Sequence, residues 1–334
     1  MGASIENQHL LAGMLSQLGR SDKCEIIKKK VTEITPSTDA SELPVIKLED
    51  GTKIEPKLII GSDGKQSMTR SSYGLETTGH SYGQKGLVCS VSTLQPNEIA
   101  FQRFLKTGPL AVLPLWGSYS SIVWSCPDDM CKELQDLSEE DFIDRINEVL
   151  QAPSEKLGAV PDRVLPKQLK KRQFETPPLI HQLDTKRYAF PLALQMAANS
   201  VSHRMALIGD AAHSVHPLAG QGLNLGISDV AYLSNVILKA KKGGQDIGDW
   251  GQVLEIYNKQ SKVNAIMIAG AIEFVKKAYD EEPLKGHNIA TDVMTVARNL
   301  GIDLIESSDY AKFNFMNFAA GSVNHPSKYE WNMN

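Results

Sequence analysis

The sequence predicts an α/β protein in which an antiparallel β-sheet interrupts an α/β unit and helices follow at the C-terminal end. Two short apolar runs closed by glycine and aspartate, at Lys57–Gly61 and Met205–Ile208, are typical of buried strands. Between them, residues 86–125 carry short β-rich runs separated by Gly, Pro, Asn and Ser, as in an antiparallel sheet. Two helical patterns follow the second run.

The first seventy-five or so residues are expected to open with a helix and continue with strands. Ile5–Leu18 places its leucines and Met14 on one helical face. Cys24–Ile34 is β-rich, and Asp50–Gly51 between two β-rich runs is a strong hairpin signal.

The central segment is expected to hold the inserted sheet and one helix. Its predicted strands are residues 86–92, 99–105, 110–115 and 120–126. Ser138 begins a capping-box-like helix start before apolar residues at helical spacing. Tyr188–Leu192 reads as one more short strand.

The last part of the chain predicts two helices. Apolar residues at helical spacing from Leu223 to Ile237 mark the first, which Gly243 ends. The second runs from about Val253 to Tyr279. We divide the chain into four segments by these patterns. Residues 1–75 and 196–250 form the two halves of an α/β part, residues 76–195 form the inserted sheet, and residues 251–334 form a helical end.

Composition limits the function classes. The 334 residues are 42% hydrophobic and 22% charged, with a net charge of -4, which is ordinary for a soluble globular protein and argues against nucleic acid as the main partner. The four cysteines form no CxxC pair, so we expect reduced thiols and no zinc site. No apolar run could span a bilayer, and the N-terminus resembles no signal or transit peptide.

The segment most informative about a ligand site is residues 204–229, RMALIGDAAHSVHPLAGQGLNLGISD. Asp210, after Gly209 at a strand tip, can accept hydrogen bonds from the hydroxyls of a sugar-like chain. Gly220 and Gly222 allow the backbone to approach a flat ring closely. The helix that begins there directs N–H groups and its positive dipole end toward the ligand.

The same segment contains two histidines and an apolar pair. Pro217 and Leu218 offer a rigid apolar wall to a ring. His213 and His216 have the spacing of possible metal ligands, but two histidines without a carboxylate partner are more often structural. We therefore expect no metal.

A second motif lies at residues 58–70, LIIGSDGKQSMTR. Asp63 and Gly64 follow the first buried strand and form a turn before a helix start. Taken alone, this pattern is as consistent with an ordinary surface turn as with a ligand site.

Together the two motifs resemble the DG and GD motifs of the group A flavoprotein monooxygenases, the family of para-hydroxybenzoate hydroxylase. Within it, the match is closest to the mitochondrial ubiquinone-biosynthesis hydroxylases. SIENQHLLAGML at 4–15 resembles their ENxxL helix, 101–115 resembles a sheet strand with a Thr-Gly-Pro turn, and ARNLGIDL at 297–304 resembles the mitochondrial members. The resemblance covers almost the whole chain.

The resemblance implies an FAD-binding Rossmann-like domain with an inserted antiparallel substrate sheet. The DG turn would lie beside the flavin and the pyrophosphate, with Arg70 holding the turn. The residues implied to bind FAD share the two motifs and the ENxxL helix: Asn7, Asp63, Gly64, Gly209, Asp210, Pro217, Gly220, Gln221, Gly222, Leu223 and Asn224. Pro217 and Leu218 would form the environment of the isoalloxazine ring.

The implied activity is ring hydroxylation of a polyprenylated phenol by O2 in ubiquinone biosynthesis, through a flavin C4a-hydroperoxide. This chemistry belongs to the flavin, so no catalytic side chain is identified. Electrons would come from NADPH or from a ferredoxin and its reductase. The substrate walls would be the sheet residues of 86–125 and the helices after 250.

The resemblance also implies a ubiquinone-biosynthesis complex at the matrix face of the mitochondrial inner membrane, attached peripherally. The stretch Phe313–Phe318 fits core packing better than membrane contact.

One family feature is missing from the sequence. Members begin with a βαβ unit carrying GxGxxG, which grips the ADP half of FAD, and no such motif follows a strand here. The chain thus reads as N-terminally truncated, and we expect it to bind FAD poorly and to hydroxylate nothing unless that unit is restored. Two other interpretations stay open: a group A hydroxylase for another aromatic substrate, and an inactive partner subunit of a biosynthetic complex.

Overall fold

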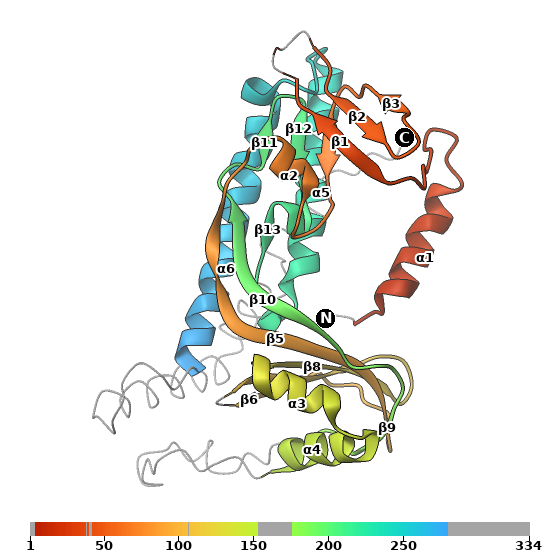
Figure 1. Ribbon diagram of the computed structural model, residues 1–334, viewed down its shortest axis with the longest axis vertical. Helices are drawn as coiled ribbons and strands as arrows, with labels where there is room; N and C mark the ends of the chain where they lie inside the picture. The colour runs from red at the N-terminus through yellow and green to blue at the C-terminus, as the bar shows by residue number, and fades with distance from the viewer. Residues whose placement is uncertain (1–3, 38, 40–41, 106, 153–175, 280–334) are drawn as a thin grey trace, which may run out of the picture. The chain divides into compact units, whose positions relative to one another are not determined.

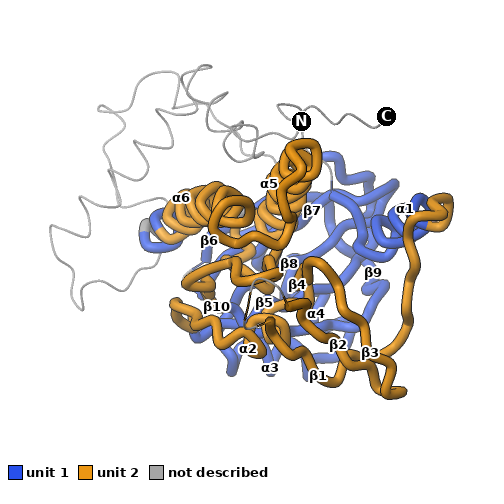
Figure 2. The backbone as a smooth tube through the Cα atoms, turned by 90° about the horizontal axis from the view of Figure 1, so that it is seen from above, with its two compact units in different colours: residues 1–18, 83–192, 274–320 blue, residues 19–82, 193–273, 321–334 orange. Residues whose placement is uncertain are grey.

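The computed structural model describes residues 4–37, 39, 42–105, 107–152 and 176–279 (Figure 1). The stretch Phe313–Phe318 and the ARNLGIDL segment lie outside these residues. The chain forms two compact units (Figure 2). Unit 1 comprises residues 1–18, 83–192 and 274–320, and unit 2 comprises residues 19–82, 193–273 and 321–334. The boundary falls inside two long strands, β5 (Thr77–Thr93) and β10 (Tyr188–Ala197).

Unit 1 is built on an antiparallel sheet. β5 pairs with β8 (Tyr119–Pro127), β8 with β7 (Gly108–Pro114), and β7 with β6 (Phe101–Leu105). β9 (Ile180–Leu183) pairs with β5 as well. The antiparallel sheet inserted into an α/β chain is confirmed, and β6, β7 and β8 begin and end within a few residues of the predicted positions. The predicted bounds of two strands were too short, because β5 already begins at Thr77 and β10 continues to Ala197.

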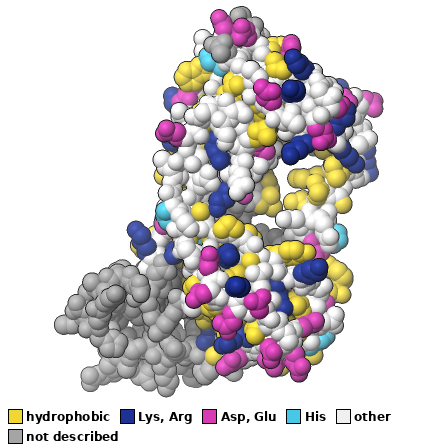
Figure 3. All heavy atoms as spheres, viewed as in Figure 1, with side chains coloured by type: hydrophobic (Ala, Val, Ile, Leu, Met, Phe, Trp, Pro, Cys, Tyr) yellow, Lys and Arg dark blue, Asp and Glu magenta, His cyan; other side chains and the backbone are white. Residues whose placement is uncertain are grey.

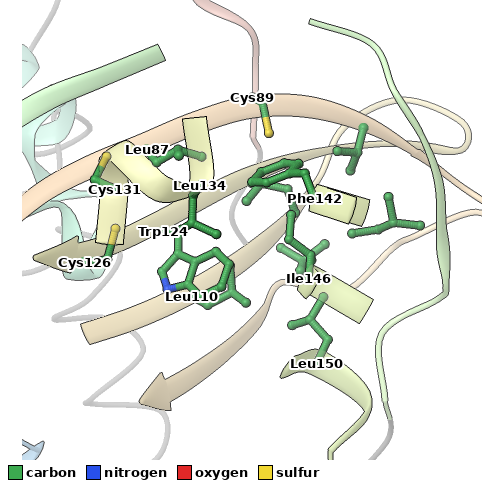
Figure 4. Packing of buried hydrophobic residues seen from close by; sticks show 14 residues of the cluster. Leu87, Cys89, Leu110, Trp124, Cys126, Cys131, Leu134, Phe142, Ile146 and Leu150 are labelled. Atoms are coloured by element: carbon green, nitrogen blue, oxygen red, sulfur yellow. The ribbon is translucent and has the colours of Figure 1, made fainter. Parts of the chain in front are cut away.

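Two helices, α3 (Asp128–Asp136) and α4 (Glu139–Gln151), cover one face of this sheet. Alternate strand residues point into the core, so Trp124 is fully buried among leucines and isoleucines (Figure 4). Ser138 caps α4 as predicted, because its hydroxyl accepts a hydrogen bond from the amide of Asp141 at 3.1 Å.

The predicted N-terminal helix is α1 (Asn7–Leu18), also in unit 1. None of its residues is buried, and its apolar face is exposed at Leu11, Met14 and Leu15.

Unit 2 begins with a small antiparallel sheet of β1 (Val31–Thr35), β2 (Val45–Leu48) and β3 (Lys53–Ile54). The predicted hairpin is confirmed, and Gly51 adopts φ +85° in its turn. The prediction of strand from Cys24 was wrong in extent, because residues 24–30 form no regular structure and the strand begins only at Val31.

A second three-stranded sheet forms the centre of unit 2. β4 (Ile59–Gly61) lies parallel to β12 (Met205–Leu207), and β11 (Val201–Ser202) pairs antiparallel with β12. Its two faces pack into separate apolar clusters. Met205 and Leu207 face the β1–β2 side, and Ala206 faces the helices.

The helices of unit 2 are α5 (Gln221–Lys242) and α6 (Glu255–Tyr279), joined through the π-helical turn η4 (Trp250–Leu254). Both predicted helices are confirmed. Of the apolar positions that marked α5, Leu233 and Ile237 pack into the core, but three others do not lie on the buried face. Leu223, Ile227 and Val230 are 40–50% exposed, because α5 turns its Gly226 and Asp229 side toward the loop after β12.

Candidate cofactor site

The DG and GD motifs lie at the carboxyl ends of two neighbouring parallel strands. In the register of β4 and β12, Leu207 lies opposite Gly61. The amide of Ile208 then donates to the carbonyl of Gly61 at 2.9 Å. Because both chains leave the sheet at the same edge, residues that are about 145 apart in sequence form one site, as ligand sites in parallel α/β sheets commonly do.

The DG turn is held by Asp63. Its carboxylate accepts hydrogen bonds from the Ser67 hydroxyl at 2.6 Å, and from the Thr69 amide at 2.9 Å and hydroxyl at 3.1 Å. Burial alone would raise the pKa of Asp63, but these hydrogen bonds outweigh it and the pKa is lowered. Gly64 adopts φ +81°, where a side chain would strain the turn. Asp63 therefore shapes the backbone that leads into α2 (Met68–Ser72).

Arg70 joins the two motifs. Its guanidinium donates to the carbonyl of Lys65 in the DG turn and to the carbonyl of Ala211 in the GD turn, both at 2.8 Å. The side chain is only 8% exposed, so these bonds are shielded from water. The prediction that Arg70 holds the DG turn is confirmed, and the same side chain also fixes the GD turn.

Gly61 lets α2 approach β4 closely. A Cβ at this position would lie 2.8 Å from Cβ of Thr69 and 2.9 Å from a methyl group of Leu207. The contact explains why the strand ends in glycine directly before the DG turn.

The GD turn begins at Gly209, which adopts φ +58° at the start of the 3₁₀ turn η2 (Gly209–Ala211). Asp210, the next residue, is exposed and makes no hydrogen bond or ion pair with the residues that the structure describes. Its carboxylate is thus available to the hydroxyls of a ligand, as the sequence predicts.

Asp229 on α5 holds the GD turn in place. The sequence analysis did not identify this residue. Its Oδ2 accepts from the amide of Gly209 at 2.8 Å, and its Oδ1 accepts from the hydroxyl of Ser261 on α6 at 2.6 Å. Nε2 of His213 lies 2.8 Å from Oδ2, outside hydrogen-bond geometry, and forms an ion pair when His213 is protonated. Asp229 is 1% exposed, which makes these contacts structural.

The segment after η2 leads to the start of α5. The short strand β13 (His213–Ser214) pairs with β10, and η3 (Pro217–Ala219) follows it. Gly220, at φ +61°, is the N-cap of α5, so no side chain caps this helix. A Cβ at Gly222 would meet no atom within 4 Å. The helix start is therefore open to a ligand on this side.

Most residues predicted to bind FAD share unit 2. Asp63 and Gly64 lie in the DG turn, Gly209 and Asp210 in the GD turn, and the rest, from Pro217 to Asn224, at η3 and the first turn of α5. Leu223 and Asn224 are exposed, whereas Gln221 is 5% exposed. Asn7 lies in unit 1 at the start of α1, and its part in the site stays a prediction.

Comparison with known proteins identifies the family. Residues 161–260 match the family model described as an FAD binding domain. The chain is 32% identical over 340 residues to the mitochondrial ubiquinone biosynthesis monooxygenase COQ6 of Xenopus tropicalis, covering 96% of this chain and 71% of the relative. The chain belongs to the ubiquinone-biosynthesis monooxygenases. This family of FAD-dependent monooxygenases also includes a relative in Danio rerio, 34% identical over 96% of this chain and 68% of its own length.

The relatives are longer than this chain. It spans 63% of the human ubiquinone-biosynthesis monooxygenase, at 34% identity over 84% of the chain. These relatives are named as mitochondrial proteins.

Solved structures support the fold of these monooxygenases. The p-nitrophenol 4-monooxygenase PnpA of Pseudomonas putida matches with a TM-score of 0.62 at 18% identity, covering 90% of this chain and 72% of its own. The anhydrotetracycline hydroxylase OxyS of Streptomyces rimosus matches with a TM-score of 0.60 at 19% identity, covering 94% of this chain and 55% of its own. The α/β fold with an inserted sheet is thus shared across aromatic hydroxylases.

The described surface, helices and side chains add three observations. Acidic and basic side chains are interspersed over the face shown in Figure 3, in keeping with a net charge of -4. Among the described helices, none combines the length and apolar character that crossing a bilayer requires. Nor do the described His, Cys, Asp and Glu residues form a group of three or more that could hold a metal ion.

Proposed function

We propose that this chain provides the ribityl and ring part of an FAD site for hydroxylating the aromatic ring of a polyprenylated phenol, with O2 as the oxidant, in ubiquinone biosynthesis. The observation that carries the proposal is Asp210. Its exposed carboxylate, which has no hydrogen-bond or ion-pair partner among the described residues, follows a parallel strand at the edge where the DG turn also leaves the sheet. The names of the relatives, ubiquinone biosynthesis monooxygenases, support the pathway, and the family resemblance implies the phenol substrate.

The residues of unit 2 fit a bound flavin. Asp210 can accept hydrogen bonds from the ribityl hydroxyls. The start of α5, capped only by Gly220, presents amide groups and the positive end of the helix dipole, which favour negative charge on a reduced ring. The open space at Gly222 leaves room for a flat ring against the backbone.

Bound FAD supplies the redox chemistry and the activation of O2. The residues of the chain position the flavin and shield it from water. Pro217 and Leu218 form an apolar wall, and Leu218 packs against the buried cluster of Leu225, Ile268 and Ile272. Asp229 fixes the amide of Gly209 and thereby the direction in which Asp210 leaves the strand. None of these roles requires a side-chain nucleophile.

The sheet of unit 1 is the proposed wall for the substrate. Its buried face is covered by α3 and α4, and the alternate residues Ala111, Leu113 and Val123 are half-buried on the opposite face. Ser90 and Ser121 lie on the same face, and we propose that the apolar side chains beside them contact the prenyl tail. We further propose peripheral attachment to the matrix side of the mitochondrial inner membrane, membership of a ubiquinone-biosynthesis complex, and electrons from NADPH or a ferredoxin and its reductase.

Oxygen transfer to a prenylated phenol tests the proposal. The chain is assayed alone and joined behind the GxGxxG unit of a relative, with FAD, each electron donor in turn and ¹⁸O2. We expect one ¹⁸O atom in the product of the joined form, no product from the chain alone, and less product from the joined Asp210→Ala variant when FAD is limiting. A joined form that binds flavin and oxidises the donor, yet hydroxylates no prenylated phenol, would contradict the substrate class. A joined form without bound flavin would favour the inactive-subunit interpretation.

A further inference from the structure

Four titratable side chains in unit 2 form a cluster next to η3, the turn that we propose to face the flavin ring. His80 and Tyr82 come from β5, His216 immediately precedes η3, and Glu273 lies on α6. The Tyr82 ring lies edge-on to both imidazoles, with its centroid 4.9 Å from each. Its hydroxyl donates to Oε1 of Glu273, and Nε2 of His80 lies 3.8 Å from Oε2 of the same carboxylate.

His216 is the innermost member of this cluster. It is 0% exposed, and its Nδ1 accepts a hydrogen bond from the amide of Leu218 at 3.1 Å, which makes it the N-cap of η3. An imidazole nitrogen can accept a hydrogen bond only when it carries no proton. The contact therefore requires neutral His216 with its proton on Nε2. A second proton would point a donor at the Leu218 amide and remove the cap.

The capped turn contains the residues proposed to face the flavin ring. Pro217 and Leu218 form η3, and Gly220 follows as the N-cap of α5. Val215 and Leu218 also pack against the buried cluster that Leu225 of α5 forms with Ile268 and Ile272 of α6. Ile272 directly precedes Glu273 in the sequence. A single cap thus connects the ring wall, the helix start and α6.

We propose that His216 is a positioning residue for the flavin ring, which it serves only as the neutral Nε2-protonated tautomer held edge-on by the Tyr82–Glu273 pair. This inference rests on the proposed function. Among the described titratable groups, Tyr82 contacts the His216 ring, and His80 on β5 and Glu273 on α6 contact Tyr82. Burial, with the bond to Glu273, raises the pKa of Tyr82, so that its hydroxyl stays protonated and remains a donor.

The tautomer can be measured without flavin. The full 334-residue chain is labelled with ¹⁵N-histidine, and the His216 signals are identified by their loss in His216→Asn. At pH 8 we expect an unprotonated Nδ1 and a protonated Nε2. Tyr82→Phe keeps the ring contact but loses the bond to Glu273, and should leave this tautomer in place. A proton on Nδ1 at pH 8 would overturn the proposal.

Flavin binding supplies the functional arm. His216→Asn retains an acceptor that can cap the turn, whereas His216→Leu does not. We expect His216→Leu to weaken riboflavin binding about fivefold, the equivalent of one helix cap, and His216→Asn to restore it. Protonation of Nδ1 at low pH should weaken riboflavin binding by the wild type, whereas His216→Asn should not show this loss. His181→Asn, at an exposed position in unit 1, is the matched control.

The two arms separate the possible failures. The predicted tautomer without flavin binding in any variant would contradict the proposed function. Equal, pH-independent riboflavin affinity in wild type and His216→Leu would overturn the positioning role itself.

Discussion

Replacing Asp229 by alanine should unfold unit 2 far more readily than replacing Asp210, although the two carboxylates serve the same turn. Asp229 is buried and accepts hydrogen bonds from Gly209 and Ser261, with His213 at ion-pair distance. Removing one partner from a buried charged network costs about 3–5 kcal/mol, because the remaining polar groups lose their partner. A unit of this size loses roughly 2–4 °C of Tm per kcal/mol. We therefore expect Asp229→Ala to lower Tm by about 6–20 °C.

Urea unfolding followed by circular dichroism, without flavin, measures the free energy of unfolding of both variants. Asp210→Ala is the matched control, and its exposed side chain should change the free energy of unfolding by less than about 0.5 kcal/mol. Asp229→Asn, which keeps an acceptor oxygen but loses the charge, should fall between them. Equal unfolding midpoints for Asp229→Ala and Asp210→Ala would refute the reasoning, since they would show that the buried contacts contribute nothing to stability.

Three further predictions follow from the geometry of the two motifs. Gly222→Val should fold normally, because a Cβ there meets open space, yet lose flavin occupancy; undiminished flavin absorbance in that variant would place the ring elsewhere. Gly61→Ala should destabilise the chain by about 1–3 kcal/mol in urea unfolding, because the new methyl would collide with Thr69, and an unchanged midpoint would count against the close packing. The lowered pKa of Asp63 stabilises the fold above its unfolded pKa of about 3.9, and this contribution is lost as pH falls through the lower folded value. Between pH 5 and pH 2, Asp63→Asn should therefore lose less stability than wild type, and an identical loss in both would argue against it.

The fold could be predicted from sequence wherever the signal was local. Turn residues and strand propensities marked the inserted sheet, Asp50–Gly51 marked the β2–β3 hairpin of unit 2, and Ser138 marked the start of α4. The GD and DG motifs were found because each combines a strand, a glycine and an aspartate in a short stretch. Their adjacency followed from the family resemblance and is visible in the pairing of β4 with β12.

The remaining features depend on contacts between distant segments. Asp229 looked like one more polar residue of a helix, and only the packing of α5 against η2 and α6 brings it to Gly209 and Ser261. The same packing decides which face of α5 is buried, which its apolar spacing did not reveal. The bond from Tyr82 to Glu273 joins residues 191 positions apart, and a helical or strand period cannot indicate such a contact.

Riboflavin binding tests the central claim most directly, because riboflavin contains the ribityl chain and the ring but no ADP half. It is titrated into residues 1–334 and into Asp210→Ala, and binding is followed by flavin fluorescence. The account predicts saturable binding at one site, weakened about 5- to 150-fold in Asp210→Ala, which corresponds to the loss of about 1–3 kcal/mol from a charge-assisted hydrogen-bond partner. Absence of saturable binding to the wild type, or equal affinity in wild type and Asp210→Ala, would contradict the claim that the GD turn and the start of α5 hold this half of the flavin.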